Sequence, residues 1–154
     1  MASTKQLMFS DGALLEMKKG VERLARAVKV TMGPRGRNVA MQKSYGGPAV
    51  TKYGVSVAKE ISLEEPLENM GAKMVIEVAK KTNDQAGDGT TAATVLAEAI
   101  FTGGLRHVAA GANPVALQRG INNAAQDASA AIEDLAIDCK GKPDYKKIAT
   151  ISAN

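Results

Sequence analysis

The sequence predicts a mainly helical protein with one small β-hairpin. Aromatic residues make up only 3% of the 154 residues and tryptophan is absent, so alanine, aliphatic side chains and seven methionines must build the core. These residues favour close-packed helices over sheet sandwiches. Apolar residues also recur at steps of three and four, which indicates amphipathic helices. Glycine and proline separate the periodic stretches and mark the loops between them.

The first predicted helix covers about residues 10–30. Its apolar side chains recur at steps of three and four, so they share one face. They are Leu14, Met17, Val21, Leu24 and Val28. Ser10 or Asp11 can cap the first turn. The glycines and proline of "TMGPRG" end the helix, because neither residue suits a helix interior. We therefore expect a loop there with little side-chain cover.

A β-hairpin is predicted for residues 37–51. "RNVAMQK" alternates apolar and polar residues, "SYGGP" is typical of a turn, and "AVTK" supplies a second short strand. A two-stranded hairpin is marginal in water, so it needs a further strand or a packing surface. The next stretch, "VSVAKEI", is too short to be assigned to a helix or a strand.

The second predicted helix begins at a capping box formed by Ser62 and Glu65. It ends near Asn83. Its apolar residues at helical spacing predict the face that packs on the core. They are Leu67, Met70, Met74, Val75 and Val78.

Two further helices are predicted. One follows "QAGDGTT", with an apolar face of Val95, Leu96, Ala99 and Ile100. Gly103 and Gly104 each cost about 1 kcal/mol relative to alanine in a helix interior, so we expect a kink or an end there. The other begins with Asn113 as N-cap and Pro114 at the first helical position, and it reaches about Ala136. Its predicted apolar face is Leu117, Ile121, Ala124, Ala128, Ile132 and Leu135.

Composition indicates a soluble, cytoplasmic protein. The single cysteine, Cys139, cannot form an internal disulfide, so nothing points to an oxidising compartment. No apolar run is long enough to span a membrane, and no membrane partner is expected. The net charge of +4 is compatible with an acidic partner. The basic residues near the N-terminus lack interleaved aromatics that stack on bases, so a basic helical nucleic-acid-binding domain is the weaker alternative.

Three loops combine small or hydroxyl residues with exposed backbone: "TMGPRG", "TKYG" and "AGDGTT". Phosphate binding needs this combination. Gly89, Thr90 and Thr91 would present N–H groups at a helix start, where the helix dipole favours an anion. Asp88 fits a Mg²⁺ ligand that bridges to phosphate oxygens, although it also fits an ordinary N-cap. The pattern is not a Walker A loop, so any nucleotide site is of another type.

These loops, together with "ENMGAKMVIEVAKKTNDQAGDGTTAATVLAEAI", resemble the group I chaperonins, the GroEL family. The resemblance runs from "AVKVTMGPRGRNV" through "GVSVAKEI" to "AGANPVALQRGI" and resumes at "TISAN". It implies that residues 1–136 are the N-terminal part of a helical equatorial domain that binds ATP. Residues 137–154 would start an intermediate domain. An apical domain and the C-terminal equatorial part would be absent from this chain.

The resemblance also implies the residues that hold the nucleotide. It puts Thr31, Met32, Gly33 and Pro34 against the nucleotide. Lys52 and Gly54 would lie beside the phosphates, and Gly89, Thr90 and Thr91 would bind phosphate oxygens. Asp88 would hold Mg²⁺. A bound K⁺ is implied near the backbone carbonyls of Thr31 and Lys52 and near Asp88.

Two departures from the family pattern affect the implied activity. Ala92 stands where a third threonine is usual, so one hydroxyl near the phosphates is missing. Tyr53 stands where the family has an aspartate that positions or activates the attacking water. A phenol with a pKa near 10 cannot do the work of a carboxylate at neutral pH. No catalytic residue is therefore assigned, and the enzymatic status is left open.

The function predicted from the resemblance is the ATP-binding portion of a chaperonin subunit, which assists ATP-dependent folding of client proteins in a ring. Its implied partners are unfolded clients, a co-chaperonin and further copies of the subunit. The alternative is a catalytically impaired or non-enzymatic fragment that binds nucleotide or associates with itself.

Overall fold

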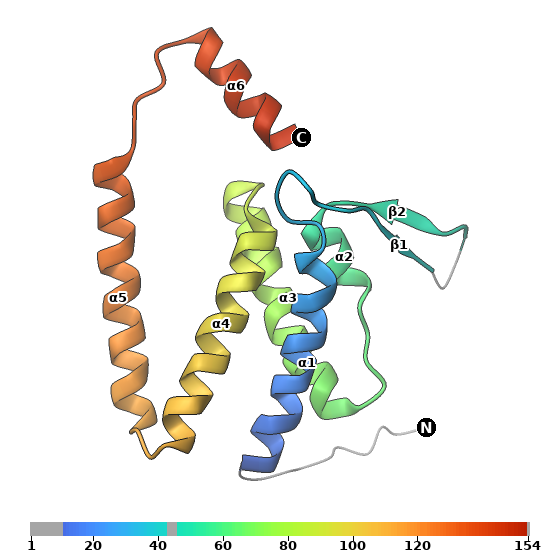
Figure 1. The fold of residues 1–154 in the computed structure, drawn as a ribbon, viewed down its shortest axis with the longest axis vertical. Coiled ribbons are helices and arrows are strands. Elements are labelled where there is room, and N and C mark those ends of the chain that lie inside the picture. The colour runs from blue at the N-terminus through green and yellow to red at the C-terminus, as the bar shows by residue number, and fades with distance from the viewer. Residues whose placement is uncertain (1–10, 43–45, 154) are drawn as a thin grey trace. The chain divides into compact units, whose positions relative to one another are not determined.

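The computed structural model describes residues 11–42 and 46–153 of the chain. Six helices and two short strands follow one another over these ranges (Figure 1). They are α1 (Asp11–Lys29), β1 (Val39–Met41), β2 (Ala49–Thr51), α2 (Gly54–Glu60), α3 (Pro66–Ala86), α4 (Thr90–Ala109), α5 (Pro114–Leu135) and α6 (Lys142–Ala153). The predicted fold class, mainly helical with one small hairpin, is confirmed.

The chain divides into two compact units, residues 1–103 and residues 104–154. The division falls inside α4. The predicted boundary between an equatorial part and an intermediate part, at residues 136 and 137, stays a prediction.

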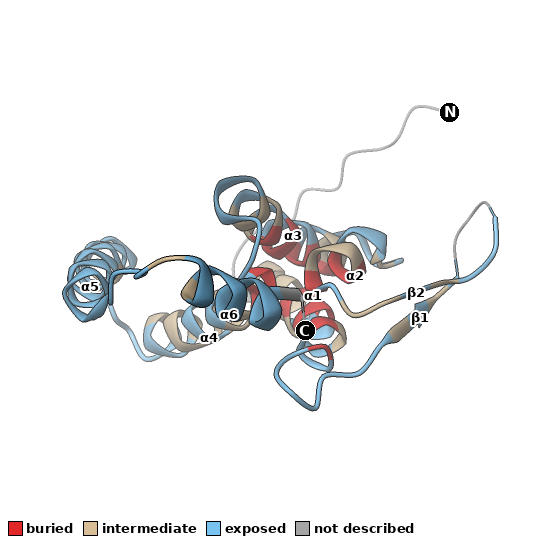
Figure 2. Ribbon diagram, turned by 90° about the horizontal axis from the view of Figure 1, so that it is seen from above, coloured by how far each residue is buried: buried red, intermediate tan, exposed pale blue. Residues whose placement is uncertain are grey.

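The core of the first unit lies where α1, α2 and α3 pack together. Figure 2 shows the buried residues gathered on these helices. Val21, Leu24 and Val28 are almost fully buried, as the apolar stripe of the first helix predicts. Leu14 and Met17, at the start of the same stripe, are only half-buried. The stripe is therefore confirmed for its C-terminal two turns.

Helix α3 buries only part of the predicted face: Val75 is buried and Leu67 and Val78 are half-buried. Met70 and Met74 are each 50% exposed. The buried residues of α3 are Glu68, Gly71, Ala72, Val75, Ile76 and Ala79. The reason is the crossing of α1 and α3: a Cβ on Gly71 would overlap the carbonyl oxygen of Met17, and one on Gly20 would overlap that of Glu68. The backbones approach too closely for methionine, so small residues occupy the contact.

One buried charge accompanies this crossing. The side chain of Glu68 is 6% exposed, and its Oε2 lies 2.7 Å from Nη1 of Arg23 on α1. The contact is an ion pair without good hydrogen-bond alignment. Because an unpaired buried carboxylate is costly, Arg23 holds α3 against α1 by charge as well as by shape.

The start of α3 corrects the predicted capping box. Ser62 lies four residues before the helix, which begins at Pro66 with Glu65 as its N-cap and no side-chain cap. The fixed φ of proline suits the first helical position, and the residue before it is pushed to an extended conformation. Proline therefore decides where the helix begins. The helix also runs three residues past Asn83, to Ala86.

Helix α4 differs from its prediction in length and in face. It continues through Gly103 and Gly104 to Ala109 without ending. Leu96 is 61% exposed and Ile100 50% exposed, so the predicted apolar face is not the buried one. The packed face carries Thr94, Ala97 and Phe101. Alanine-rich sequence leaves several faces of similar hydrophobicity, and tertiary contacts choose among them.

The hairpin forms as predicted, and the unassigned stretch after it is helical. β1 and β2 pair antiparallel, with Val39 opposite Thr51 and Met41 opposite Ala49. The stretch "VSVAKEI" lies mainly in α2, which buries Val57 and Ala58 against the core. Residues 43–45 of the predicted turn, and the possible cap Ser10, lie outside the described residues.

The second unit contains the end of α4 together with α5 and α6. Asn113 caps α5 as predicted, because its Oδ1 accepts hydrogen bonds from the backbone N–H groups of Val115 and Ala116 at 2.9 and 3.1 Å. No residue of α5 is buried, and of its predicted apolar face only Leu117 and Ile121 are half-buried. Residues 142–153, for which no element was predicted, form α6.

Candidate functional site

Three loops of the first unit meet at one point. Oγ1 of Thr31, at the end of α1, lies 3.3 Å from Oγ1 of Thr91 in the first turn of α4. Gly54, the first residue of α2, packs so closely on Thr91 that a Cβ would overlap the threonine hydroxyl. The same Cβ would lie 3.1 Å from Cγ1 of Val28. The ends of α1, α2 and α4 therefore converge, and with them all three loops predicted to bind a nucleotide.

The segment 87–91 presents a turn of exposed backbone into a helix start. Gly87 ends α3 in the left-handed conformation, with φ 70°, and Gly89 also has a positive φ of 78°. Asp88 lies between them, and its Oδ1 accepts a hydrogen bond of 2.7 Å from the N–H of Gly89. The carbonyl of Gly89 accepts from the N–H of Ala93 at 2.9 Å. Gly89 is therefore the residue that precedes α4, and Asp88 is not its N-cap.

This geometry suits an anion. The first N–H groups of a helix have no partners within the helix, so those of Thr90 and Thr91 point beyond its N-terminus. Thr90 is buried, and its carbonyl accepts from Oγ1 of the fully buried Thr94 at 2.9 Å. This contact fixes the first turn from inside. The exposed carboxylate of Asp88 stands just outside it.

The loop after α1 is held tightly by its own backbone. Oγ1 of Thr31 donates to the carbonyl of Val28 at 2.8 Å, and the N–H of Arg37 donates to the carbonyl of Val30 at 2.7 Å. A Cβ on Gly36 would overlap the carbonyl of Thr31, so only glycine fits there. Gly33 has a φ of 74° and open space around it. Met32 and Pro34, the other two residues predicted to contact the nucleotide, are exposed.

The segment 52–54 carries the departure from the family pattern. Tyr53 is the N-cap of α2 and makes no side-chain cap. Its N–H donates to Oγ1 of Thr51 at 3.1 Å, and the residue is 58% exposed. Lys52 before it is half-buried. The phenol is therefore available to solvent, on the residue that directly precedes Gly54.

Metal binding by protein ligands alone has no support in the described part of the chain. No cluster of three or more histidine, cysteine, aspartate or glutamate residues occurs there that could hold a metal. Magnesium does not need such a cluster, since it is commonly held by one or two carboxylates plus substrate phosphates and water. Asp88, one exposed carboxylate beside a helix N-terminus, fits that pattern.

Sequence reasoning named the loops but missed what joins them. Thr94 was not singled out, because a threonine on an alanine-rich helix has no periodicity signal. The contact between Thr31 and Thr91 joins residues 60 positions apart, and nothing local predicts it. A threonine inside a helix can donate its hydroxyl to the carbonyl four residues earlier, and this tendency of Thr94 is the one signal that could have indicated the buried contact.

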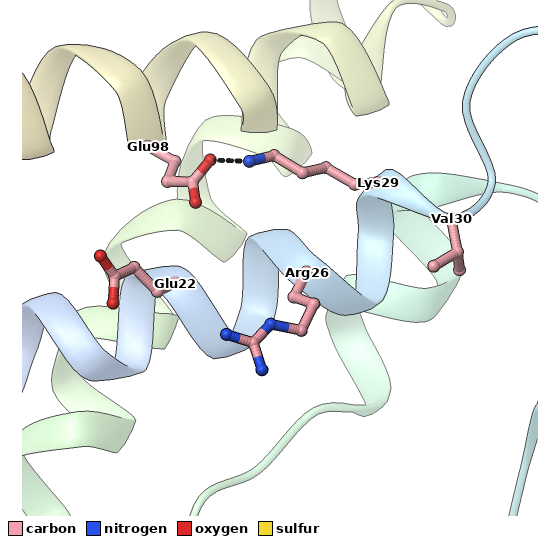
Figure 3. Close-up of a pocket in the computed structure, with 5 residues that line it drawn as sticks. All are labelled: Glu22, Arg26, Lys29, Val30 and Glu98. Atoms are coloured by element: carbon pink, nitrogen blue, oxygen red, sulfur yellow. Dashed lines mark ion pairs between the residues drawn. The ribbon is translucent and has the colours of Figure 1, made fainter.

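A pocket elsewhere in the first unit was also not predicted. It lies between α1 and α4 and is lined by Glu22, Arg26, Lys29, Val30 and Glu98 (Figure 3). Lys29 and Glu98 form an ion pair across it. Two acids and two bases balance one another, so the pocket has no net charge that would attract an ionic ligand.

Comparison with known proteins assigns the family. The model of the TCP-1/cpn60 chaperonin family matches residues 24–154. Among solved structures, the crystal structure of a group III chaperonin in the open state is similar, with a TM-score of 0.71 and 29% sequence identity over 83% of this chain. The match covers 25% of that protein, so this chain spans about a quarter of its length.

These matches confirm the resemblance at the level of the chaperonins, while the narrower assignment to group I stays a prediction. Among the described residues, none of the helices combines the length and apolar character that crossing a bilayer requires. The family match, the fold and the convergence of the three loops agree, and the chain belongs to the TCP-1/cpn60 chaperonin family.

Proposed function

We propose that this chain is the ATP-binding portion of a chaperonin subunit and that the three converging loops hold ATP with Mg²⁺. The observation that carries the proposal is the contact of Thr31, Gly54 and Thr91 at the ends of three helices. A nucleotide is large enough to touch all three loops. If the glycines around Asp88 served only to end one helix and start the next, the other two loops would not need to lie beside them.

Each loop has a distinct role in this proposal. The backbone N–H groups of Thr90 and Thr91 bind phosphate oxygens, because the helix N-terminus attracts negative charge. The N–H of Gly89 donates to Oδ1 of Asp88 in this structure and would join them once Asp88 turns to the metal. Asp88 holds Mg²⁺, which neutralises phosphate charge when bound. Residues 31–34 line the nucleotide, and Lys52 and Gly54 lie beside the phosphates. The carbonyls of Thr31 and Lys52, with Asp88, hold K⁺.

Tyr53 favours a second form of the function: a subunit that binds ATP and hydrolyses it slowly. A phenol does not replace a carboxylate as the base that takes a proton from the attacking water. ATP binding does not need a base at this position, so Tyr53 lowers the rate of hydrolysis without lowering the affinity for ATP. Asp88 is the carboxylate of the three loops, and we assign it to Mg²⁺ binding and not to activation of water.

Replacing Asp88 with asparagine tests the binding proposal. Asp88→Asn removes one negative charge from the Mg²⁺ shell and keeps the side-chain shape, so we expect MgATP affinity to fall about tenfold or more, or about 1.4 kcal/mol. Calorimetric titration of ATP with and without Mg²⁺ measures it. The matched control is Asp84→Asn, an exposed acid near the end of α3. Equal Mg²⁺ dependence in all three proteins would remove Asp88 from the metal shell.

Replacing Tyr53 with aspartate tests turnover. Tyr53→Asp supplies the missing carboxylate, and general-base assistance commonly contributes a factor of about 100 or more. We expect faster phosphate release at unchanged ATP affinity. Tyr53→Phe is the control, since it removes the hydroxyl without adding a base. Equally rapid hydrolysis by the unmodified chain and the Tyr53→Asp variant would contradict the slow-turnover form.

The wider chaperonin activity rests on the family. Ring assembly with further subunits, binding of unfolded clients, action with a co-chaperonin and residence in the cytoplasm follow from the resemblance. The hairpin β1–β2 supports assembly, because two strands alone are marginal and their edges can accept a strand from a neighbouring subunit. Sedimentation over a range of concentrations checks it, and a monomer at every concentration would count against it.

A further inference from the structure

A second pocket of the first unit lies away from the three loops and shares none of their residues. It is lined from the end of α2 by Lys59 and Ile61, and from α3 by Lys73, Ile76, Glu77 and Lys80. We call it the lysine pocket. Its volume of about 660 Å³ falls within the range of ligand-binding pockets.

The charge of the lysine pocket is unbalanced. Nζ of Lys80 donates to Oε1 of Glu77 at 2.8 Å, so these two charges compensate each other. Lys59 and Lys73 remain, both exposed and without an ion pair among the described residues. Two ammonium groups at the mouth of one pocket favour a ligand that carries at least two negative charges.

The floor of the lysine pocket is apolar. Ile76 is 7% exposed and belongs to the core, and Ile61 is half-buried and packs against it. A small inorganic anion would leave this surface uncovered. A ligand with an apolar group between its charges would remove it from water at the same time as it pairs with the lysines.

The length of the lysine pocket favours a peptide. Its lining residues extend along one face of α3 from Asn69 to Lys80, which is roughly 16 Å at about 1.5 Å per residue. An extended chain of about five residues has the same length. We propose that the lysine pocket binds an extended acidic peptide segment that carries an apolar side chain between its carboxylates.

A labelled peptide tests the proposal on the full chain. The probe is the fluorescein-labelled pentapeptide Glu-Glu-Leu-Glu-Glu, titrated by fluorescence anisotropy at low salt. We expect saturable binding that weakens about tenfold in the double variant Lys59→Gln/Lys73→Gln, since two charge contacts are lost. The control variant Lys81→Gln/Lys142→Gln removes the same charge from lysines outside the pocket, and we expect less than about a twofold change.

Two further measurements separate the pocket from general electrostatic attraction. The peptide Glu-Glu-Gly-Glu-Glu has the same charge without the apolar side chain, and we expect several-fold weaker binding. The variant Glu77→Gln removes the one acid of the pocket, and we expect tighter binding. In chemical-shift mapping on the unmodified chain, addition of the peptide Glu-Glu-Leu-Glu-Glu should shift the backbone signals of Lys73 and Ile76.

The proposal is overturned by any of three results: no binding at low salt, an equal loss in the two double variants, or shifts that spread evenly over the surface lysines. Circular dichroism of each variant confirms that the helices are intact. The nucleotide proposal is unaffected by these outcomes, because the probe contains no phosphate.

Discussion

The two units of this chain use similar helices and bury them very differently. Helices α1 and α5 both carry an apolar stripe at helical spacing, yet α1 buries Val21, Leu24 and Val28 while α5 has no buried residue. Apolar periodicity therefore predicts that both helices form, and in α1 it also predicts which side is buried. It does not predict that a partner is present within the same chain.

Contact surfaces explain the difference. Helices α1 and α3 approach at Gly20 and Gly71 closely enough that a Cβ would overlap backbone atoms. Gly120, in the middle of α5, has no neighbour within 4 Å of where a Cβ would lie. The same residue type is a spacer in one unit and an ordinary weak helix former in the other.

The largest expected difference concerns leucine. Leu24 has an exposed fraction of 0%, whereas that of Leu135 is 80%. Leu24→Ala should lower the free energy of unfolding by about 3 kcal/mol, because it leaves a cavity in close-packed surroundings. Leu135→Ala should change it by less than about 0.5 kcal/mol. Urea unfolding followed by circular dichroism measures both. Similar losses in the two variants would mean that α5 is packed in solution.

Glycine to alanine should have opposite signs in the two units. Gly71→Ala forces a Cβ onto the carbonyl of Met17, and we expect a loss of about 2 kcal/mol from overpacking. Gly120→Ala adds a Cβ in open space, so the better helix propensity should stabilise α5 by roughly 0.5 to 1 kcal/mol. Thermal unfolding measures both. If Gly71→Ala leaves the free energy of unfolding unchanged, α1 and α3 can move apart without cost.

A smaller effect is expected at the convergence of the loops. Gly54→Ala brings a Cβ against Oγ1 of Thr91, and we expect a loss of about 1.5 kcal/mol together with weaker MgATP binding. The double variant Gly54→Ala/Thr91→Ala removes the obstructing hydroxyl and should recover part of the stability. Strict additivity of the two changes, measured by urea unfolding, would argue against direct contact.

The smallest effect is expected at the start of α5. Asn113→Ala removes the acceptor of two backbone hydrogen bonds, so the first turn should lose roughly 0.5 to 1 kcal/mol. Hydrogen exchange of the amides of residues 115–118 measures this locally. Asn113→Asp keeps an acceptor oxygen and should exchange as the unmodified chain does. Exchange in Asn113→Ala that is as slow as in the unmodified chain would indicate that the cap contributes little.

Local signals in the sequence predicted most of the elements. The stripe of α1, the hairpin and the Asn113–Pro114 start of α5 form where expected, because each depends on residues close together in the chain. Errors arose where distant contacts decide. Met70 and Met74 stay half exposed since the crossing selects Gly71 and Ala72 instead. Similarly, the packing of Phe101 on the core, and not the hydrophobicity of Leu96, selects the inner face of α4.

The candidate site was predictable in its parts and not in its assembly. Paired glycines before "TTAAT" predict a turn that leads into a helix start, and Gly87 and Gly89 take positive φ angles there. That this backbone binds an anion stays a prediction. That Thr31, Gly54 and Thr91 meet follows only from tertiary structure or from the family resemblance. The roles assigned to these residues in holding ATP and Mg²⁺ stay predictions.

The contact between Thr31 and Thr91 also has a kinetic consequence. Because 60 residues separate them along the chain, their meeting closes a long loop and requires that α1, α2 and α3 are already packed. The site should thus be one of the last features of the first unit to form during folding. A ligand that binds there recognises only the finished unit and lowers the population of incompletely folded chains by mass action.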